Sequence, residues 1–342
     1  MKRRFCLLIV VLAAVVPSVS AQTDGGFRSD VKGPPYPWTH RNFADEAGAL
    51  RFAIVADRAG SPRPGVFERA VQMLNLLQPE FVLSVGDVAD NPDDGASVPE
   101  FDREHTVLDN IVGKLKMPFF YVAGNHDIYN DLAAQRYRTR HGKPYYSFVY
   151  KNVLFLVLCT EDPPPDNISK EQVAYVKQAL QANQDVRWTF VFLHKPVFTN
   201  GKDTANPAWT QIETSLADRP YTVFAGHWHN CNAYTKGGRK YIVLATTGGA
   251  SNLAGPKEGR FDEIVWVTLG KTDKEPAIAN LALNGILPWD FRPPVSLDPA
   301  PAEKAKETPP AETNPSGSTT TAETKPTPPP AEPSGENTPP TQ

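Results

Sequence analysis

The sequence has few cysteines and no excess of positive charge. Only three of its 342 residues are cysteine, and Cys6 lies in an N-terminal apolar run. The other two, Cys159 and Cys231, could form one optional bridge at most, and Cys159 ends an apolar run as a buried core residue does. The formal net charge is −3 with both signs mixed along the chain, so no basic stripe is present to follow a nucleic acid backbone. The expected partner is a small molecule or a group presented by another protein.

Aromatic residues are missing from the C-terminal part of the chain. None follows Phe291, and residues 293–342 are mostly Pro, Thr, Glu, Ala and Ser. Such a composition cannot bury enough apolar surface to offset the entropy lost on ordering. We therefore expect residues 291–342 to form a disordered tail. It is either an inert solvated segment or a spacer or glycan-attachment stretch.

The N-terminal apolar run is too short for a membrane-spanning helix, which needs about 20 apolar residues. The run covers residues 5–16, follows Lys2, Arg3 and Arg4, and precedes the small residues Ser20 and Ala21. This order predicts a secretory signal peptide over residues 1–21 that is cleaved and leaves no stable membrane anchor. We expect a periplasmic or secreted protein, exported by general secretion rather than by the twin-arginine route.

Residues 51–290 alternate short apolar runs with stretches of helical spacing, which predicts an α/β domain behind an N-terminal extension at 22–50. Strands expected at 51–56 and 81–85 flank a helix at 67–77, forming a βαβ unit. The other expected elements are helices at 101–115 and 171–182, strands at 119–122, 145–150, 153–158, 188–193 and 222–225, and a hairpin through Gly237-Gly238. Since no helices are expected between the later strands, the second half should be mixed or antiparallel sheet.

Five of these strands are followed by side chains that can bind metal ions. The residues are Asp57, Asp87, Asn125 with His126 and Asp127, His194, and His227 with His229. Ligands of open α/β sheets bind outside the carboxyl ends of the strands, so these side chains should converge. Glycines before Asp87, Asn125 and His227 let the backbone approach the site closely. Carboxylate, imidazole and amide oxygen together suit zinc, manganese or iron better than calcium. The lone histidines His40, His105 and His141 receive no role.

The order of these motifs resembles the calcineurin-like metallophosphoesterase family over roughly residues 51–270. Within the family, the segments 145–148 and 191–194 are similar to the purple acid phosphatases and the bacterial cyclic-nucleotide phosphodiesterases. The resemblance implies two packed mixed β-sheets flanked by helices, in a four-layer α/β/β/α sandwich. It also implies hydrolysis of small phosphate mono- or diesters by water that two metal ions activate.

The resemblance assigns a role to each of these residues. Asp87 bridges the two ions, Asp57 and His229 bind the first ion, and Asn125, His194 and His227 bind the second. His126 would be the general acid or a stabiliser of the transferred phosphoryl group, with Asp127 orienting it. The ions would be divalent or trivalent zinc, manganese or iron.

The sequence departs from the family pattern at the first metal. The histidine expected two residues after Asp57 is replaced by Ala59. In purple acid phosphatases a tyrosine three residues after the bridging aspartate completes this site, and here that position is Asp90. Asp90 is thus either a substitute ligand or a residue that caps its loop. Arg58 and Arg63 are either phosphate contacts or surface arginines.

The incomplete first site leaves two functions open. The first is an exported phosphoesterase with both metals bound. The alternative is a binding or scaffold protein that kept the fold and lost turnover. Any preference for monoesters or diesters would depend on the loops at 91–99, 162–169 and 200–207, whose shape the sequence does not fix.

Overall fold

The computed structural model describes residues 26–44, 48–91, 97–199 and 206–283, followed by positions 285, 287–289, 292 and 295–297. The signal peptide predicted at 1–21 lies outside the described residues, as does most of the tail predicted at 291–342. No helix in the described part of the chain is long and apolar enough to span a bilayer.

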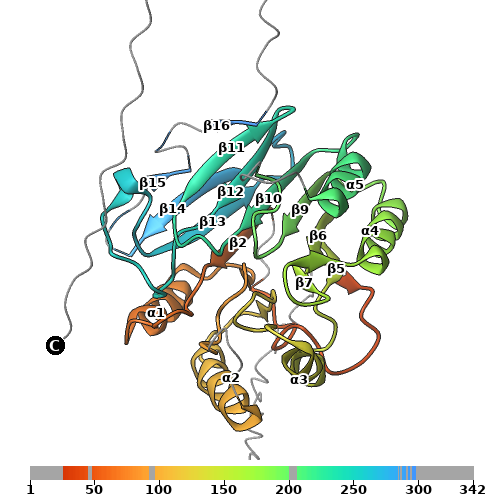
Figure 1. Cartoon of the computed structure of the whole chain (residues 1–342). Helices are drawn as coiled ribbons and strands as arrows, with labels where there is room; N and C mark the ends of the chain where they lie inside the picture. Colours follow the sequence, from red (N-terminus) through yellow and green to blue (C-terminus); the bar gives the residue numbers. More distant parts are fainter. Residues whose placement is uncertain are drawn as a thin grey trace, which may run out of the picture. The chain divides into compact units, whose positions relative to one another are not determined.

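Two large mixed β-sheets pack face to face, as the sequence predicted (Figure 1). The eight-stranded sheet contains, in spatial order, β1 (Arg28–Ser29), β5 (Tyr146–Tyr150), β6 (Val153–Val157), β9 (Trp188–Phe192), β10 (Tyr221–Ala225), β12 (Arg239–Val243), β11 (Asn232–Lys236) and β16 (Val295–Ser296). The six-stranded sheet contains β15 (Leu287–Pro288), β14 (Ala277–Ala282), β13 (Glu263–Leu269), β2 (Leu50–Val55), β3 (Val82–Ser84) and β4 (Phe119–Phe120). A separate pair consists of β7 (Glu161–Asp162) and β8 (Asn167–Ile168).

Helices cover the outer face of each sheet. The described helices are α1 (Val66–Leu77), α2 (Val98–Val112), α3 (Asp131–His141), α4 (Lys170–Ala182), α5 (Pro207–Leu216) and the 3₁₀ turn η1 (Pro256–Glu258). Apolar side chains of α1 and α2 pack on the six-stranded sheet, and those of α4 and α5 pack on the eight-stranded sheet. The result is the four-layer α/β/β/α arrangement that the resemblance implied (Figure 1).

The space between the sheets is filled mainly by aromatic rings. Phe52 of β2 stacks on Phe81 at 5.4 Å and meets Phe155 and Phe190 edge-on at 5.3 and 5.0 Å. Because successive residues of a strand point to opposite faces, the neighbour Ala53 faces α1 instead. This double burial explains why the strand is apolar from Phe52 to Val55.

The structure confirms the predicted strands and helices and adds two helices. Helix α2 begins three residues earlier than expected, because Ser97 and Glu100 form a capping box. The predicted antiparallel pair β5 and β6 is joined by Lys151 and Asn152, both with positive φ. The sequence pattern did not predict α3 or α5. Helix α3 has few apolar positions, so little periodicity marks it.

Paired strands extend beyond both predicted boundaries of the α/β domain. Before residue 51, β1 pairs with β5, and Trp38 forms a bridge with Phe120. After residue 291, β16 pairs with β11 through Val295 and Tyr234. The composition therefore placed these boundaries too close to the centre of the chain, because strands of two residues carry no detectable pattern.

Candidate metal centre

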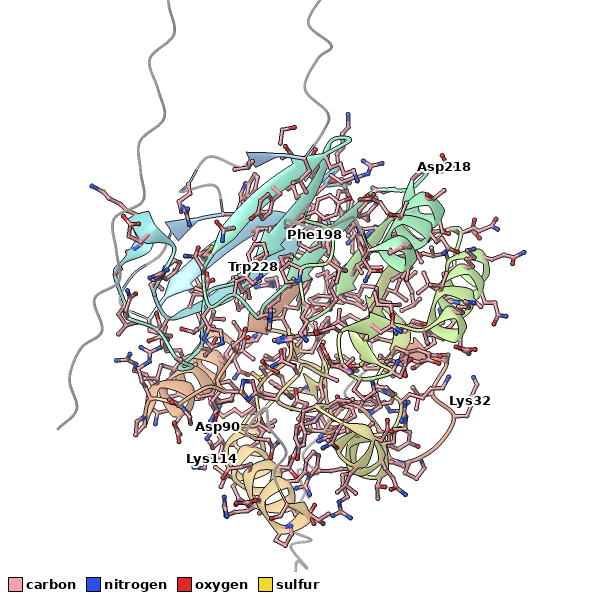
Figure 2. All side chains as sticks on the ribbon, in the orientation of Figure 1. Lys32, Asp90, Lys114, Phe198, Asp218 and Trp228 are labelled. Atoms are coloured by element: carbon pink, nitrogen blue, oxygen red, sulfur yellow. The ribbon has the colours of Figure 1, made fainter. Side chains whose placement is uncertain are left out.

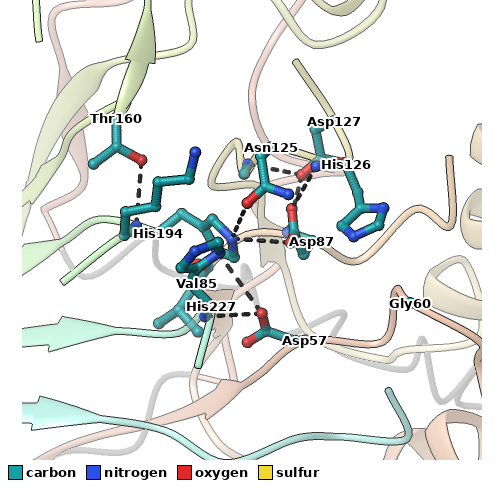
Figure 3. A network of polar contacts seen from close by, with 12 residues as sticks. Asp57, Gly60, Val85, Asp87, Asn125, His126, Asp127, Thr160, His194 and His227 are labelled. Atoms are coloured by element: carbon teal, nitrogen blue, oxygen red, sulfur yellow. Dashed lines mark hydrogen bonds and ion pairs between the residues drawn. The ribbon is translucent and has the colours of Figure 1, made fainter. Parts of the chain in front are cut away.

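The loops that follow β2, β3, β4, β9 and β10 meet at one place, where the predicted ligands face one another (Figure 3). The residues brought together are Asp57, Asp87, Asn125, His194, His227 and His229. Asp57, Asp87 and His194 are at most 1% exposed, so the centre lies at the bottom of the converging loops. The structure therefore brings these six predicted side chains together at the ends of the strands.

His194 presents one ring nitrogen to the other ligands. Its Nδ1 lies 2.9 Å from the carbonyl oxygen of Val85, which can only accept a hydrogen bond, so Nδ1 carries the proton. Its Nε2 then lies 2.9 Å from Asp87 Oδ2 and 3.0 Å from Asn125 Oδ1, two further acceptors. Such an arrangement suits either a protonated ring or a metal ion facing the Nε2 lone pair. Burial opposes the protonated ring, but the Asp87 charge raises the His194 pKa to about 9.

The second predicted metal site has a compact donor set. One ligand atom each from Asp87, His194 and His227 lies within 4.8 Å of the others. Burial, followed by the charges of His194 and Lys195, lowers the pKa of His227 to about 4, so its imidazole is neutral as a metal ligand must be. A carboxylate, two imidazoles and the Asn125 amide oxygen fit zinc, manganese or iron.

The first predicted metal site contains fewer ligands. His229 Nδ1 lies 2.7 Å from the Ala250 carbonyl oxygen, which turns Nε2 toward Asp57 Oδ1 at 3.4 Å. Asp57 Oδ1 also accepts the His227 backbone N–H at 2.9 Å, while Asp57 Oδ2 is buried with no hydrogen-bond partner among the described residues. An unpartnered buried carboxylate oxygen is costly, and a cation would satisfy it. Ala59 is fully buried beside the site and offers no ligand.

Glycines allow the ligand loops to approach closely. A Cβ on Gly86 would lie 2.6 Å from His194 Nδ1, and one on Gly124 or Gly226 would overlap the carboxylate of Asp87 or Asp57. These contacts confirm the reason given for the glycines from the sequence. Three non-glycine residues here also have positive φ, which costs about 1–3 kcal/mol each in a folded protein. They are Asp87 (54°), His227 (73°) and His229 (50°).

Asn91 holds the predicted general acid His126. The His126 Nδ1 contacts the backbone carbonyl oxygen of Asn91, and Asn91 Nδ2 donates to the His126 carbonyl oxygen at 3.0 Å. Asp127 Oδ2 instead accepts the backbone N–H groups of Gly124 and Asp87 at 2.9 and 3.0 Å. Asp127 therefore fixes two ligand loops to each other, which differs from the orienting role predicted for it. No sequence pattern singled out Asn91, which lies in the loop after Asp90.

The remaining predicted residues have structural contacts. Asp90 Oδ1 accepts the Gly60 backbone N–H at 2.8 Å, which supports the loop-capping alternative. Arg58 is only 8% exposed and donates to the Val88 carbonyl oxygen at 3.3 Å, so it is not a surface residue. Arg63 donates to both carboxylate oxygens of Asp262, at 2.8 and 2.5 Å. Its guanidinium is therefore engaged inside the protein rather than left to bind a phosphate.

Lys195, next to the ligand His194, is a cation that the sequence did not single out. Its Nζ lies 2.9 Å from Glu161 Oε1 and also contacts Asp166. The Glu161 side chain is fully buried, whereas that of Asp166 is 69% exposed. The Lys195 charge is close enough to help lower the His227 pKa. A positive charge therefore lies beside the second predicted metal site.

Residues 50–231 match the family model of the calcineurin-like phosphoesterases. The chain belongs to this family. The match confirms the resemblance drawn from the motif order, and it covers every predicted metal ligand. The chemistry of the calcineurin-like phosphoesterase family is metal-dependent hydrolysis of phosphate esters.

Several solved structures are similar to this calcineurin-like phosphoesterase at low sequence identity. Purple acid phosphatase PPD1 from yellow lupin (Lupinus luteus) seeds is 14% identical with a TM-score of 0.50, and the match covers 70% of this chain and 52% of the lupin chain. GAP50, the anchor in the inner membrane complex of Plasmodium, is 15% identical over 69% of this chain and 85% of its own, with a TM-score of 0.49. PhoD is 13% identical over 74% of each chain, with a TM-score of 0.47. No curated protein sequence matches.

Proposed function

We propose that the protein is an exported hydrolase of small phosphate mono- or diesters that uses two metal ions. The observation that carries the proposal is the group formed by the buried Asp87 and His194 and the partly buried His227, whose ligand atoms lie within 4.8 Å of one another. Metal ions bound there would polarise the ester and lower the pKa of a bound water toward neutrality. The signal peptide expected at residues 1–21 would bring the protein to the periplasm or the medium.

The family pattern assigns different roles to the carboxylates of Asp87 and Asp57. Asp87 Oδ2 faces His194, and Asp87 Oδ1 is fixed by the backbone N–H of His126 at 2.8 Å. In the proposed site, Asp87 would be the ligand shared by the two ions. Asp57 and His229 would complete the first site, with the unpartnered Asp57 Oδ2 as the free donor.

His126 is the candidate proton donor to the leaving oxygen. Its Nδ1 contacts the Asn91 carbonyl oxygen, which orients the ring. The ring is partly exposed, unlike that of His194. A protonated Nε2 could release its proton to the departing alkoxide as the P–O bond breaks.

Lys195 is the candidate contact for the substrate phosphate. It lies beside the second metal site, and one of its two carboxylate partners, Asp166, is largely exposed. An entering phosphate can replace such an exposed partner at small cost, since exposed ion pairs contribute only about 0–1 kcal/mol. Arg63 is excluded from this role by its bonds to Asp262, and Arg58 remains a weaker candidate because its side chain is buried.

The alternative function is a binding or scaffold protein of the same fold, and Ala59 favours it. A histidine at that position would give the first site a further ligand, and the alanine leaves Asp57 and His229 with Asp87 alone. Asp90 Oδ1 accepts the Gly60 N–H, so Asp90 could restore the ligand number through its other carboxylate oxygen.

Metal content and hydrolysis measured on the same preparation separate the two functions. The enzyme should bind close to two metal ions per chain and hydrolyse an aryl phosphate or its diester. Asp87→Ala and Asn125→Ala should abolish turnover. Asp218→Ala changes an exposed aspartate at the far end of the eight-stranded sheet (Figure 2), so it serves as the matched control. One bound ion and no turnover with any added metal would establish the scaffold function instead.

A further inference from the structure

The N-terminal segment 26–44 is fixed to both sheets. At one end β1 pairs with β5 through Arg28 and Val149. At the other end, Thr39 N–H donates to the Phe119 carbonyl oxygen at 3.0 Å, and Tyr121 N–H donates to that of Pro37 at 2.9 Å. The chain between these points crosses from one sheet edge to the other. Side chains on this segment are therefore held in place relative to one another.

This segment forms a cavity of about 240 Å³ whose charged lining residues are all positive. The lining residues are Phe27, Arg28, Ser29, Val31, Lys32, Tyr36, Trp38 and Arg41. The three cations are exposed, and the structure records no ion pair for any of them within the described part of the chain. Three cations and no acid in one cavity contrast with a chain whose net charge is −3.

Aromatic rings form the rest of the cavity wall. Tyr36, which is 41% exposed, stacks on Trp38 at 5.1 Å with the ring planes 21° apart. Phe27 meets Trp38 edge-on at 5.5 Å, and the guanidinium of Arg41 lies 5.9 Å from the centre of the Phe27 ring. These ring–ring and cation–π contacts fix the orientation of the rings and of Arg41, at a moderate cost in side-chain entropy. The cavity thus offers a planar apolar surface beside concentrated positive charge.

We propose that this cavity binds a phosphate monoester carried on a ring-bearing small molecule. A phosphate dianion matches three cations better than a carboxylate with one charge, and arginine forks pair with phosphate oxygens in two parallel bonds. The ring of the ligand would lie against Tyr36 and Trp38. The volume is below the roughly 300–1,000 Å³ of pockets for drug-sized ligands, so it suits a phosphate and about one ring.

This site is independent of the proposed hydrolysis, since none of its lining residues belongs to the metal centre. The experiment measures hydrogen–deuterium exchange of peptides covering residues 26–44, which locates binding to the segment. The probes are phosphonate analogues of a nucleoside monophosphate and of a sugar phosphate, in which carbon replaces the ester oxygen so that turnover does not consume them. Inorganic phosphate and the neutral nucleoside test each half of the ligand alone.

We expect both phosphonates to protect residues 28–41 and to bind at least tenfold more tightly than the neutral nucleoside. Arg28→Gln and Arg41→Gln should each weaken binding about tenfold or more, and higher salt should weaken it further. Lys114→Gln, at an exposed lysine away from Lys32 (Figure 2), should leave binding unchanged.

Three results would overturn the proposal. The first is an absence of protection in segment 26–44 with every probe at millimolar concentration. The second is equal binding by wild type and by the Arg28→Gln, Arg41→Gln double variant. The third is protection by the neutral nucleoside equal to that by its phosphonate, which would show an aromatic site without anion recognition. A preference for the nucleoside phosphonate over the sugar phosphonate would identify a base as the ring against Tyr36.

Discussion

Replacing Arg63 by methionine separates a structural role of this arginine from a phosphate-binding role. The guanidinium makes two bonds to the Asp262 carboxylate, one to the Gly249 carbonyl oxygen at 3.0 Å and one to Thr246 Oγ1 at 3.2 Å. A hydrogen bond to a charged group contributes about 1.5–3 kcal/mol, and bonds within one network do not add. Asp262 keeps its bonds to Thr246 and to the Gly248 N–H after the change. We therefore expect the free energy of unfolding to fall by about 2–3 kcal/mol.

For a domain of this size, such a loss lowers the melting temperature by about 4–12 °C. Scanning calorimetry or urea denaturation measures the change, with Arg69→Met on the exposed face of α1 as the matched arginine control. The Michaelis constant for an aryl phosphate should stay within about twofold of wild type. Unchanged stability together with a Michaelis constant raised tenfold would refute the structural account and restore Arg63 as a phosphate contact.

Three further predictions concern Asp90, Lys195 and Glu263. Asp90→Ala should leave the metal content, measured by elemental analysis, unchanged. It should lower the free energy of unfolding by about 1 kcal/mol, because it removes the bond to the Gly60 N–H. A loss of one ion per chain would instead make Asp90 a ligand. Lys195→Met should raise the Michaelis constant about tenfold while both metals stay bound, and Lys170→Met on α4 is the control. Burial, opposed by hydrogen bonds, raises the Glu263 pKa to about 7. The folded state therefore holds this proton more tightly than the unfolded chain does. As the pH rises from about 4.5 to 7, the free energy of unfolding of wild type should fall relative to that of Glu263→Gln by up to ~3 kcal/mol, as measured by urea titrations.

The group of candidate metal ligands could be predicted from the sequence because its members follow recognisable strands, and three of the six directly follow a glycine. Asp57, Asp87 and His194 needed only the rule that ligands gather at the carboxyl ends of strands. The partners of the charged side chains in these loops could not be predicted in this way. Lys195 depends on Glu161, and Arg63 on Asp262, which lies far along the chain. Neither the burial of a charged side chain nor its partner is visible without the fold.

The N-terminal segment was missed for another reason. It joins the sheets through the two-residue strand β1 and through a single bridge at Trp38, so it shows no alternation of apolar and polar residues. Helix α3 was missed because its sequence is dominated by charged and polar residues. In both cases tertiary contacts stabilise a segment whose local pattern is weak.

The position of β2 inside its sheet determines when the protein can fold. Although β2 is made early, it pairs on one side with β3 and on the other with β13, so that Val55 lies opposite Ile264. Asp57 lies two residues after the end of β2 and bridges to Thr246. The six-stranded sheet therefore cannot be completed until nearly the whole domain has left the ribosome, and pairing over such distances along the chain is slow. A chain interrupted before β13 would retain the residues of the second metal site but would lose the strand that fixes Asp57.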